Sequence, residues 1–137
     1  MKKRVLVVDD HPQVVELIKL RLESAGYQVI AAYDGHDGLK KAREENPDLI
    51  ILDVMLPKMN GYKVCRLLKF DRRYRHIPIV MLTSRAKQAD AEIGYRTGAD
   101  EYIFKPYDPK KLLEVVRKYA GSSSQKEIKR KTKGVQS

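Results

Sequence analysis

Five polar residues stand where short apolar segments end, at positions far apart in the chain. They follow four separate segments and offer three carboxylates, a hydroxyl and an ammonium group: Asp9, Asp10, Asp53, Thr83 and Lys105. Carboxylates that share one site repel one another, and a divalent cation relieves that repulsion. Oxygen ligands favour Mg²⁺ or Mn²⁺. A metal, an ammonium group and a hydroxyl complement a phosphoryl group, so the set is typical of phosphoryl transfer onto an aspartate.

The elements that must bring these residues together alternate along the first 120 residues. β-Branched apolar segments predict strands at 4–9, 27–33, 48–53, 77–83 and 101–105. Apolar residues at helical spacing predict five helices: one ended by Gly26, one stopped by Asn46–Pro47, one after Asn60–Gly61, a weakly amphipathic one over 85–97, and one opened by Asp108–Pro109. Such alternation predicts a parallel sheet covered on both faces, which binds ligands at the carboxyl ends of its strands.

Each polar residue alone also has an ordinary structural explanation. An aspartate after a strand usually caps a helix, and a lone Thr83 or Lys105 would be a capping or solvated residue. Asp53 is harder to explain in this way, because it ends the most apolar segment of the chain and needs a compensating partner there. The coincidence of all five at strand ends therefore favours a functional site. His11 is expected to lie exposed beside the acid pocket and to begin a helix, with no required role.

Composition restricts the class of protein further. One cysteine, Cys65, excludes an intramolecular disulfide and favours a reducing, cytoplasmic location. The apolar segment Val5–Val8 is shorter than the about 7–15 apolar residues of a secretion signal. No stretch approaches the ~18 apolar residues of a membrane span. We therefore expect a cytoplasmic, globular protein with a real hydrophobic core.

The net charge of +10 first raises nucleic acid or an acidic membrane as partners. Residues 121–137 carry five basic residues against one acid and open with Gly-Ser-Ser-Ser, so we expect a disordered tail, with a polybasic arm for an anionic partner as the alternative. A second basic cluster, 66–76, contains Phe70 and Tyr74. It is interpreted as a solvated helix end and loop, or as a surface contact site.

Four longer motifs carry a resemblance to a known family. They read VLVVDD at 5–10, PDLIILDVMLPKMNG at 47–61, IVMLTS at 79–84 and GADEYIFKP at 98–106. The sequence resembles the receiver domain of two-component response regulators, the CheY-like superfamily. That resemblance covers residues 4–119 and implies a five-stranded parallel sheet of order 2-1-3-4-5 with five helices on both faces. We expect residues 1–120 to form this domain.

The resemblance also assigns roles to the residues of the acidic site. Asp53 would be the phosphoacceptor. Asp10, Asp53 and the Met55 carbonyl would hold Mg²⁺, and Asp9 would act mainly through bridging water.

Further roles follow from the same resemblance on the other two strand ends. Thr83 and Lys105 would bind the phosphoryl group. Tyr102 would move inward as Thr83 shifts toward the phosphate. The Lys105–Pro106 peptide bond would be cis.

The leading hypothesis is a phosphoacceptor switch and not an enzyme acting on a separate substrate. A histidine kinase or a histidine phosphotransfer protein would supply the phosphate. Phosphorylation would reshape the face built from residues 85–97, the strand 101–105 and the helix after it, for a downstream protein target. The protein would be a monomer or a phosphorylation-dependent dimer.

Two other functions stay open at this stage. The chain could be the receiver part of a DNA-binding transcriptional regulator whose output domain is absent from this sequence. Residues 121–137 hold no helix-turn-helix pattern, so DNA binding is not expected from this chain itself. The tail could alternatively bind nucleic acid or a membrane surface, with a steep dependence on salt.

Overall fold

The computed structural model describes residues 2–84 and 98–121. Their strands form one parallel sheet in the order β2-β1-β3-β4-β5. The strands are β1 (Arg4–Val8), β2 (Gln28–Ala32), β3 (Leu49–Asp53), β4 (Ile79–Ser84) and β5 (Glu101–Lys105). The predicted sheet and its strand order are therefore confirmed.

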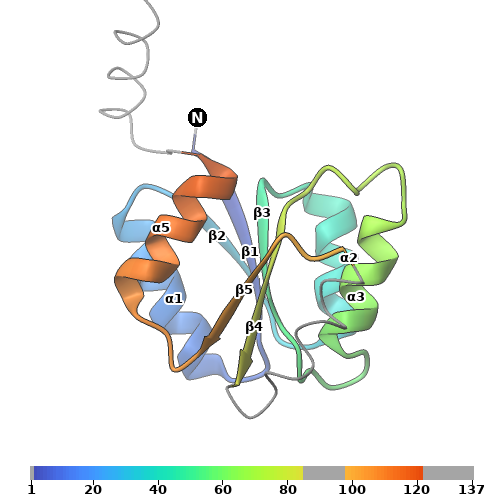
Figure 1. Ribbon diagram of the computed structural model, residues 1–137, viewed down its shortest axis with the longest axis horizontal. Coiled ribbons are helices and arrows are strands. Elements are labelled where there is room, and N and C mark those ends of the chain that lie inside the picture. Colours follow the sequence, from blue (N-terminus) through green and yellow to red (C-terminus); the bar gives the residue numbers. More distant parts are fainter. Residues whose placement is uncertain (1, 85–97, 122–137) are drawn as a thin grey trace, which may run out of the picture.

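Four helices in the described part of the chain cover both faces of the sheet. They are α1 (Pro12–Ser24), α2 (Gly35–Glu45), α3 (Gly61–Lys69) and α5 (Pro109–Ala120). Figure 1 shows α1 and α5 on one face and α2 and α3 on the other. The helix expected at 85–97 and the tail expected at 121–137 lie outside the described residues, apart from Gly121.

Helix boundaries follow from local chemistry. Asp34, Asn60 and Asp108 each accept a hydrogen bond from a backbone N–H in the first turn of the helix that they precede. Pro12 and Pro109 occupy first helical positions, where a missing N–H costs nothing. These capping residues and prolines mark where each helix begins, after the preceding strand.

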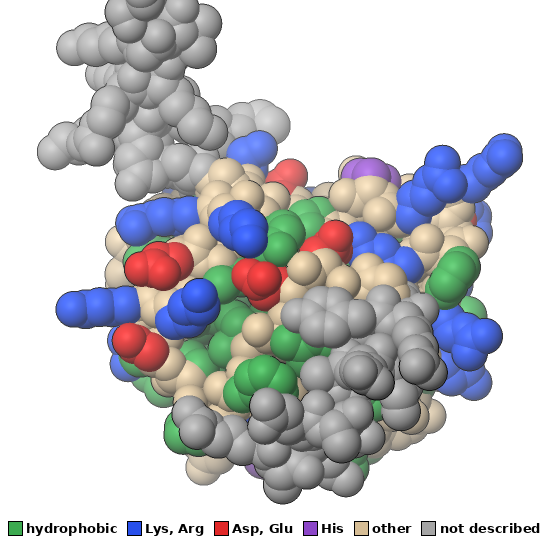
Figure 2. All heavy atoms as spheres, in the orientation of Figure 1, with side chains coloured by type: hydrophobic (Ala, Val, Ile, Leu, Met, Phe, Trp, Pro, Cys, Tyr) green, Lys and Arg blue, Asp and Glu red, His purple; other side chains and the backbone are tan. Residues whose placement is uncertain are grey.

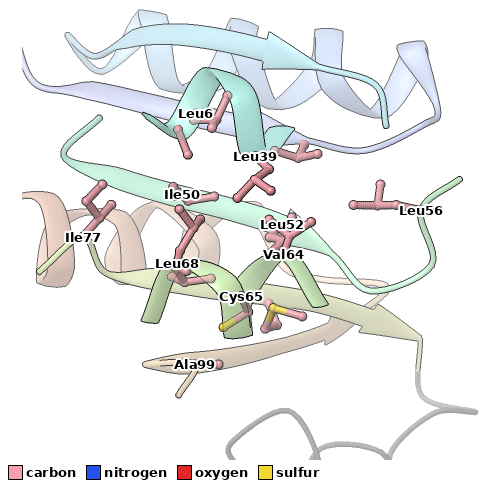
Figure 3. Packing of buried hydrophobic residues seen from close by; sticks show 14 of the residues in the cluster. Leu6, Leu39, Ile50, Leu52, Leu56, Val64, Cys65, Leu68, Ile77 and Ala99 are labelled. Atoms are coloured by element: carbon pink, nitrogen blue, oxygen red, sulfur yellow. The ribbon is translucent and has the colours of Figure 1, made fainter. Parts of the chain in front are cut away.

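Alternation along the strands divides the core into two layers. Leu6, Ile50 and Leu52 pack with α2 and α3 (Figure 3). Val5 and Val7, on the opposite side of β1, pack with α1 and α5. The central strand β3 is buried along its whole length, as expected for a sheet covered on both faces.

Apolar residues at helical spacing located the helices, but not all of these residues are buried. Leu17 is 45% exposed and Leu67 is 38% exposed, whereas Val15 and Cys65 are fully buried. A helix packed on a sheet buries only one stripe, and neighbouring apolar residues beside that stripe stay at the surface. The side chains of Leu17 and Leu67 are therefore not part of the core.

Candidate functional site

The carboxyl ends of four strands meet at one edge of the sheet, as the sequence predicts. Asp9 and Asp10 follow β1, Asp53 ends β3, and Lys105 ends β5. Thr83 lies in β4, opposite Phe104 of β5 in the parallel register. After Asp53 the chain runs through a loop to Asn60, the N-cap of α3. The arrangement brings the strand ends together, with Asp9, Asp53 and Thr83 buried.

Lys105 joins the two most deeply buried carboxylates of the site. Its Nζ lies 3.1 Å from Asp9 Oδ2 and 3.4 Å from Asp53 Oδ1, and it donates a hydrogen bond to each. The Asp9 side chain is fully buried, and that of Asp53 is 7% exposed. Burial acts to lower the pKa of Lys105, but its attraction to Asp53 and Asp9 outweighs this and raises it. Lys105 therefore stays charged and holds both acids.

Burial also changes the acidity of Asp53. Desolvation of the carboxylate, with repulsion from Asp9 and Asp10, raises the pKa of Asp53 to about 6 even though Lys105 opposes the change. A carboxylate with this pKa is ionised near neutral pH but is easily protonated below it. Any cation that enters the site would compensate the buried charge.

His11 lies beside the acids, as its sequence position indicates, and its side chain is largely exposed. Its Nδ1 lies 2.9 Å from Asp9 Oδ1 and 3.2 Å from Asp10 Oδ1, and its backbone N–H donates to Asp9 Oδ1. The hydrogen bond with Asp9 and the charge of Asp10 raise the pKa of His11. Its place directly after two acids, at the N-cap of α1, is the sequence signal that could have indicated this contact.

Two buried oxygen atoms of the site, Asp10 Oδ1 and Thr83 Oγ1, make no hydrogen bond among the described residues. Asp10 Oδ1 has a contact with His11 Nδ1, at 3.2 Å. Buried polar atoms are normally satisfied, so both oxygens are suited to accept a further ligand contact. Ligand atoms of Asp9, Asp10 and His11 lie within 4.8 Å of one another, close enough to coordinate one ion. The donor set thus fits a hard divalent cation, with oxygen ligands predominating.

The remaining predicted residues lie near this edge with different exposures. The Met55 side chain is 61% exposed on the loop after β3. Tyr102 is 9% exposed and stacks on Phe104, with ring centroids 6.2 Å apart. Strand alternation places Thr83 and Tyr102 on the same face of the sheet, toward α2 and α3. The Lys105–Pro106 peptide bond is cis.

Comparison with known proteins gives the class of protein. Residues 5–117 match the family model of the response regulator receiver domain, and the chain belongs to this family. This agrees with the fold and with the resemblance found in the sequence motifs.

Curated relatives are longer than this chain. It is 46% identical over 112 residues to the alkaline phosphatase synthesis transcriptional regulatory protein PhoP of Bacillus subtilis, covering 82% of this chain and 46% of that protein. It is 44% identical over 117 residues to the DNA-binding response regulator MtrA of Mycolicibacterium smegmatis, covering 85% of this chain and 50% of MtrA. The chain thus spans about half the length of the curated relatives that it matches.

Solved structures include a similar domain with a metal ion. The receiver domain of the sensor histidine kinase PA1611 from Pseudomonas aeruginosa PAO1, with magnesium coordinated in its active-site cleft, is 30% identical. The match has a TM-score of 0.81 and covers 89% of this chain and all of that one. Among the described helices of this chain, none has the length and apolar character needed to span a membrane.

The raised pKa of Asp53 predicts a pH-dependent stability. Because folded Asp53 binds its proton more tightly than the unfolded chain does, protonation stabilises the fold, and this contribution is lost as pH rises from about 4 to about 6. In metal-free buffer, Asp53→Asn should gain about 1–3 kcal/mol relative to the wild type across this range, then level off. Urea unfolding at several pH values measures the difference.

Asp71→Asn serves as the control for this measurement. Hydrogen bonds from Arg73 lower the pKa of Asp71, so the wild type should gain stability relative to Asp71→Asn as pH rises through the acid range. Relative to the wild type, Asp53→Asn should therefore gain stability as pH rises, and Asp71→Asn should lose it. A difference between wild type and Asp53→Asn that stays constant with pH would contradict the buried charge.

The unpartnered Thr83 hydroxyl predicts an unusual response to substitution. Thr83→Val keeps the shape of the side chain and removes a buried hydroxyl that has no partner among the described residues, so stability should stay the same or rise by about 1 kcal/mol. The reverse change on the same strand, Val80→Thr, should destabilise by about 1–3 kcal/mol. Thermal unfolding compares the two. A clear loss of stability in Thr83→Val would show that the hydroxyl is already satisfied.

Proposed function

We propose that the chain is a phosphoacceptor switch in which Asp53 accepts a phosphoryl group from a histidine kinase or a histidine phosphotransfer protein. The observation that carries this proposal is the buried Asp53 carboxylate, held 3.4 Å from Lys105 beside two further acids at the carboxyl edge of the sheet. Membership of the receiver family supports the reaction type. The chain would act on itself and would turn over no separate substrate.

The transfer forms one bond and breaks one. A carboxylate oxygen of Asp53 attacks the phosphorus of a phosphohistidine, and the P–N bond breaks as the new P–O bond forms. The electron pair of the broken bond returns to the imidazole nitrogen, which then takes up a proton from water. Lys105, already placed beside Asp53, would neutralise an oxygen of the transferred group, and the Thr83 hydroxyl would donate to another.

A magnesium ion, or manganese in its place, fits the same acids. Asp9, Asp10 and Asp53 would hold it with the Met55 carbonyl, with Asp9 acting through water. When bound, the ion neutralises phosphoryl oxygens during transfer. Three features support this assignment: the buried Asp10 oxygen that makes no hydrogen bond among the described residues, the carboxylate cluster, and the magnesium in the PA1611 receiver domain.

Thr83 and Tyr102 would carry the switch. Occupation of the Thr83 hydroxyl by a phosphoryl oxygen changes the packing on the face of the sheet that also holds Tyr102. The signal would reach a downstream protein target through β5 and α5, with residues 85–97 as a third element of that face. We propose a cytoplasmic protein that is monomeric or dimerises on phosphorylation.

The direct test combines a small phosphodonor with Mg²⁺. Incubation with acetyl phosphate should add one phosphoryl group to the intact protein mass. The gain should vanish in Asp53→Asn and when EDTA removes the metal, because the nucleophile or the neutralising charge is lost.

The control for the phosphodonor experiment is Asp37→Asn, which removes an acid of α2 outside the site and should retain the gain. Absence of any mass gain in the wild type while Mg²⁺ is bound would refute the assignment. So would a gain that persists in Asp53→Asn.

A second candidate is the receiver part of a DNA-binding transcriptional regulator. Curated relatives carry such names, and this chain spans about half of their length. In that case phosphorylation of Asp53 would control an output domain joined after α5. The chemistry of the site would be the same, and the target would be DNA.

The two candidates make different predictions for DNA binding. If the second is correct, the full natural gene product should retard its target DNA in a gel-shift assay, more strongly after phosphorylation, whereas a protein ending at residue 137 should not. Scrambled DNA of equal length is the control. Failure of the full gene product to bind any promoter DNA would favour the single-domain switch.

A further inference from the structure

Helix α3 has a second stripe of side chains that the core does not use. Its inner stripe, Gly61, Val64, Cys65 and Leu68, is buried against the sheet. Lys63, Arg66, Leu67 and Phe70 follow the same i, i+3, i+4, i+7 spacing on the outside, with Phe70 as the C-cap residue. Leu67 is 38% and Phe70 72% exposed. This outer stripe therefore presents apolar surface between cationic groups.

The outer stripe lines an open groove of about 1150 Å³. Arg43 at the end of α2 and Arg72 in the loop after α3 add two more cations to its rim. Figure 2 shows Lys and Arg side chains along the flank that carries α3, on both sides of a hydrophobic patch. The groove thus combines an apolar floor with a basic rim.

The cations of this rim are available to a partner. Within the described ranges, no carboxylate lies at ion-pair distance from Arg43, Lys63, Arg66 or Arg72. The acid of the groove, Asp71, forms an ion pair with Arg73, whose Nη2 lies 2.9 Å from Asp71 Oδ2. The charge of Asp71 also reaches Arg43, but one acid against five cations in the lining leaves the groove with a net positive charge.

Charge disfavours two occupants that this chain could itself supply. A second copy would bring a further net charge of +10. The segment 121–137 carries five basic residues and one acid, so it would also be repelled from the rim. Charge therefore favours a different molecule, with negative charge, as the occupant.

We propose that the groove on α3 is a docking site for an acidic amphipathic segment of a partner protein. Apolar side chains of the partner would pack on Leu67 and Phe70, while its carboxylates pair with Arg43, Arg66 and Arg72. An apolar centre inside a charged rim is the usual composition of a protein interface. Nucleic acid would use the cations and stack a base on Phe70, but only a protein segment with apolar side chains also buries the aliphatic Leu67. The groove acts independently of the phosphorylation proposed for Asp53.

The experiment titrates ¹⁵N-labelled protein with a short synthetic helical peptide that has Leu and Phe at i, i+3 and i+4 spacing and Glu elsewhere. Amide shifts should cluster at residues 62–73 and around Arg43, and should weaken as salt is added. A peptide with the same apolar residues but Lys in place of Glu should leave these amides unchanged.

Two pairs of variants make the test specific. Phe70→Ala and Arg66→Glu should each weaken peptide binding by about tenfold or more. Leu20→Ala on α1 and Lys111→Glu on α5 change an exposed apolar group and an exposed cation elsewhere, and should bind as the wild type does. All four should still accept phosphate from acetyl phosphate, which separates this test from that of Asp53.

Three results would overturn the proposal. One is an acidic peptide that shifts no amide of the groove, and another is equal binding by the Lys peptide. The third is a single-stranded or duplex DNA oligonucleotide that shifts the same amides at lower concentration than the peptide, since this would make the groove a nucleic-acid site.

Discussion

The structure depends above all on one cation held between buried acids. Placing the Asp9 and Asp53 carboxylates beside each other costs desolvation and mutual repulsion, and Lys105 offsets both from the end of β5. Compensation is incomplete, since the pKa of Asp53 remains raised to about 6. The edge of the sheet thus favours binding of a further cation beside the acids. It also favours an anionic group whose oxygens contact Lys105. A protein with a net charge of +10 therefore carries its chemistry in a local concentration of acid.

The rest of the fold serves to hold those strand ends in register. Parallel strands buried on both faces cannot shift by a residue without moving core side chains into the wrong layer. The continuous burial of β3 therefore fixes where Asp53 emerges, and the register of β4 on β5 fixes Thr83 relative to Tyr102. The charged side chains outside this edge lie at the protein surface. The cations on the outer stripe of α3 form a separate feature, since none of them lines the acidic site.

Much of this could be predicted from the sequence because the signals are local. Apolar segments ending in acids predicted both the strands and the edge at which Asp9 and Asp53 meet. Prediction was weaker where burial depends on neighbours: Leu17 and Leu67 fit the helical spacing but lie at the surface, since spacing does not reveal which side of a stripe contacts the sheet. The place of His11 beside the acids was predicted, but its distances to Asp9 and Asp10 were not.

The sequence by itself therefore determined the order of the elements, the residue types of the site and the family, since these depend on composition, spacing and local capping. Only the tertiary structure decided which atoms meet. The sharing of Lys105 by two carboxylates, the lack of a partner for Thr83 Oγ1 among the described residues, and the exposure of Phe70 are all set by how strands and helices pack. Distances between side chains far apart in the chain, and the desolvation that shifts a pKa, exist only once the sheet has formed.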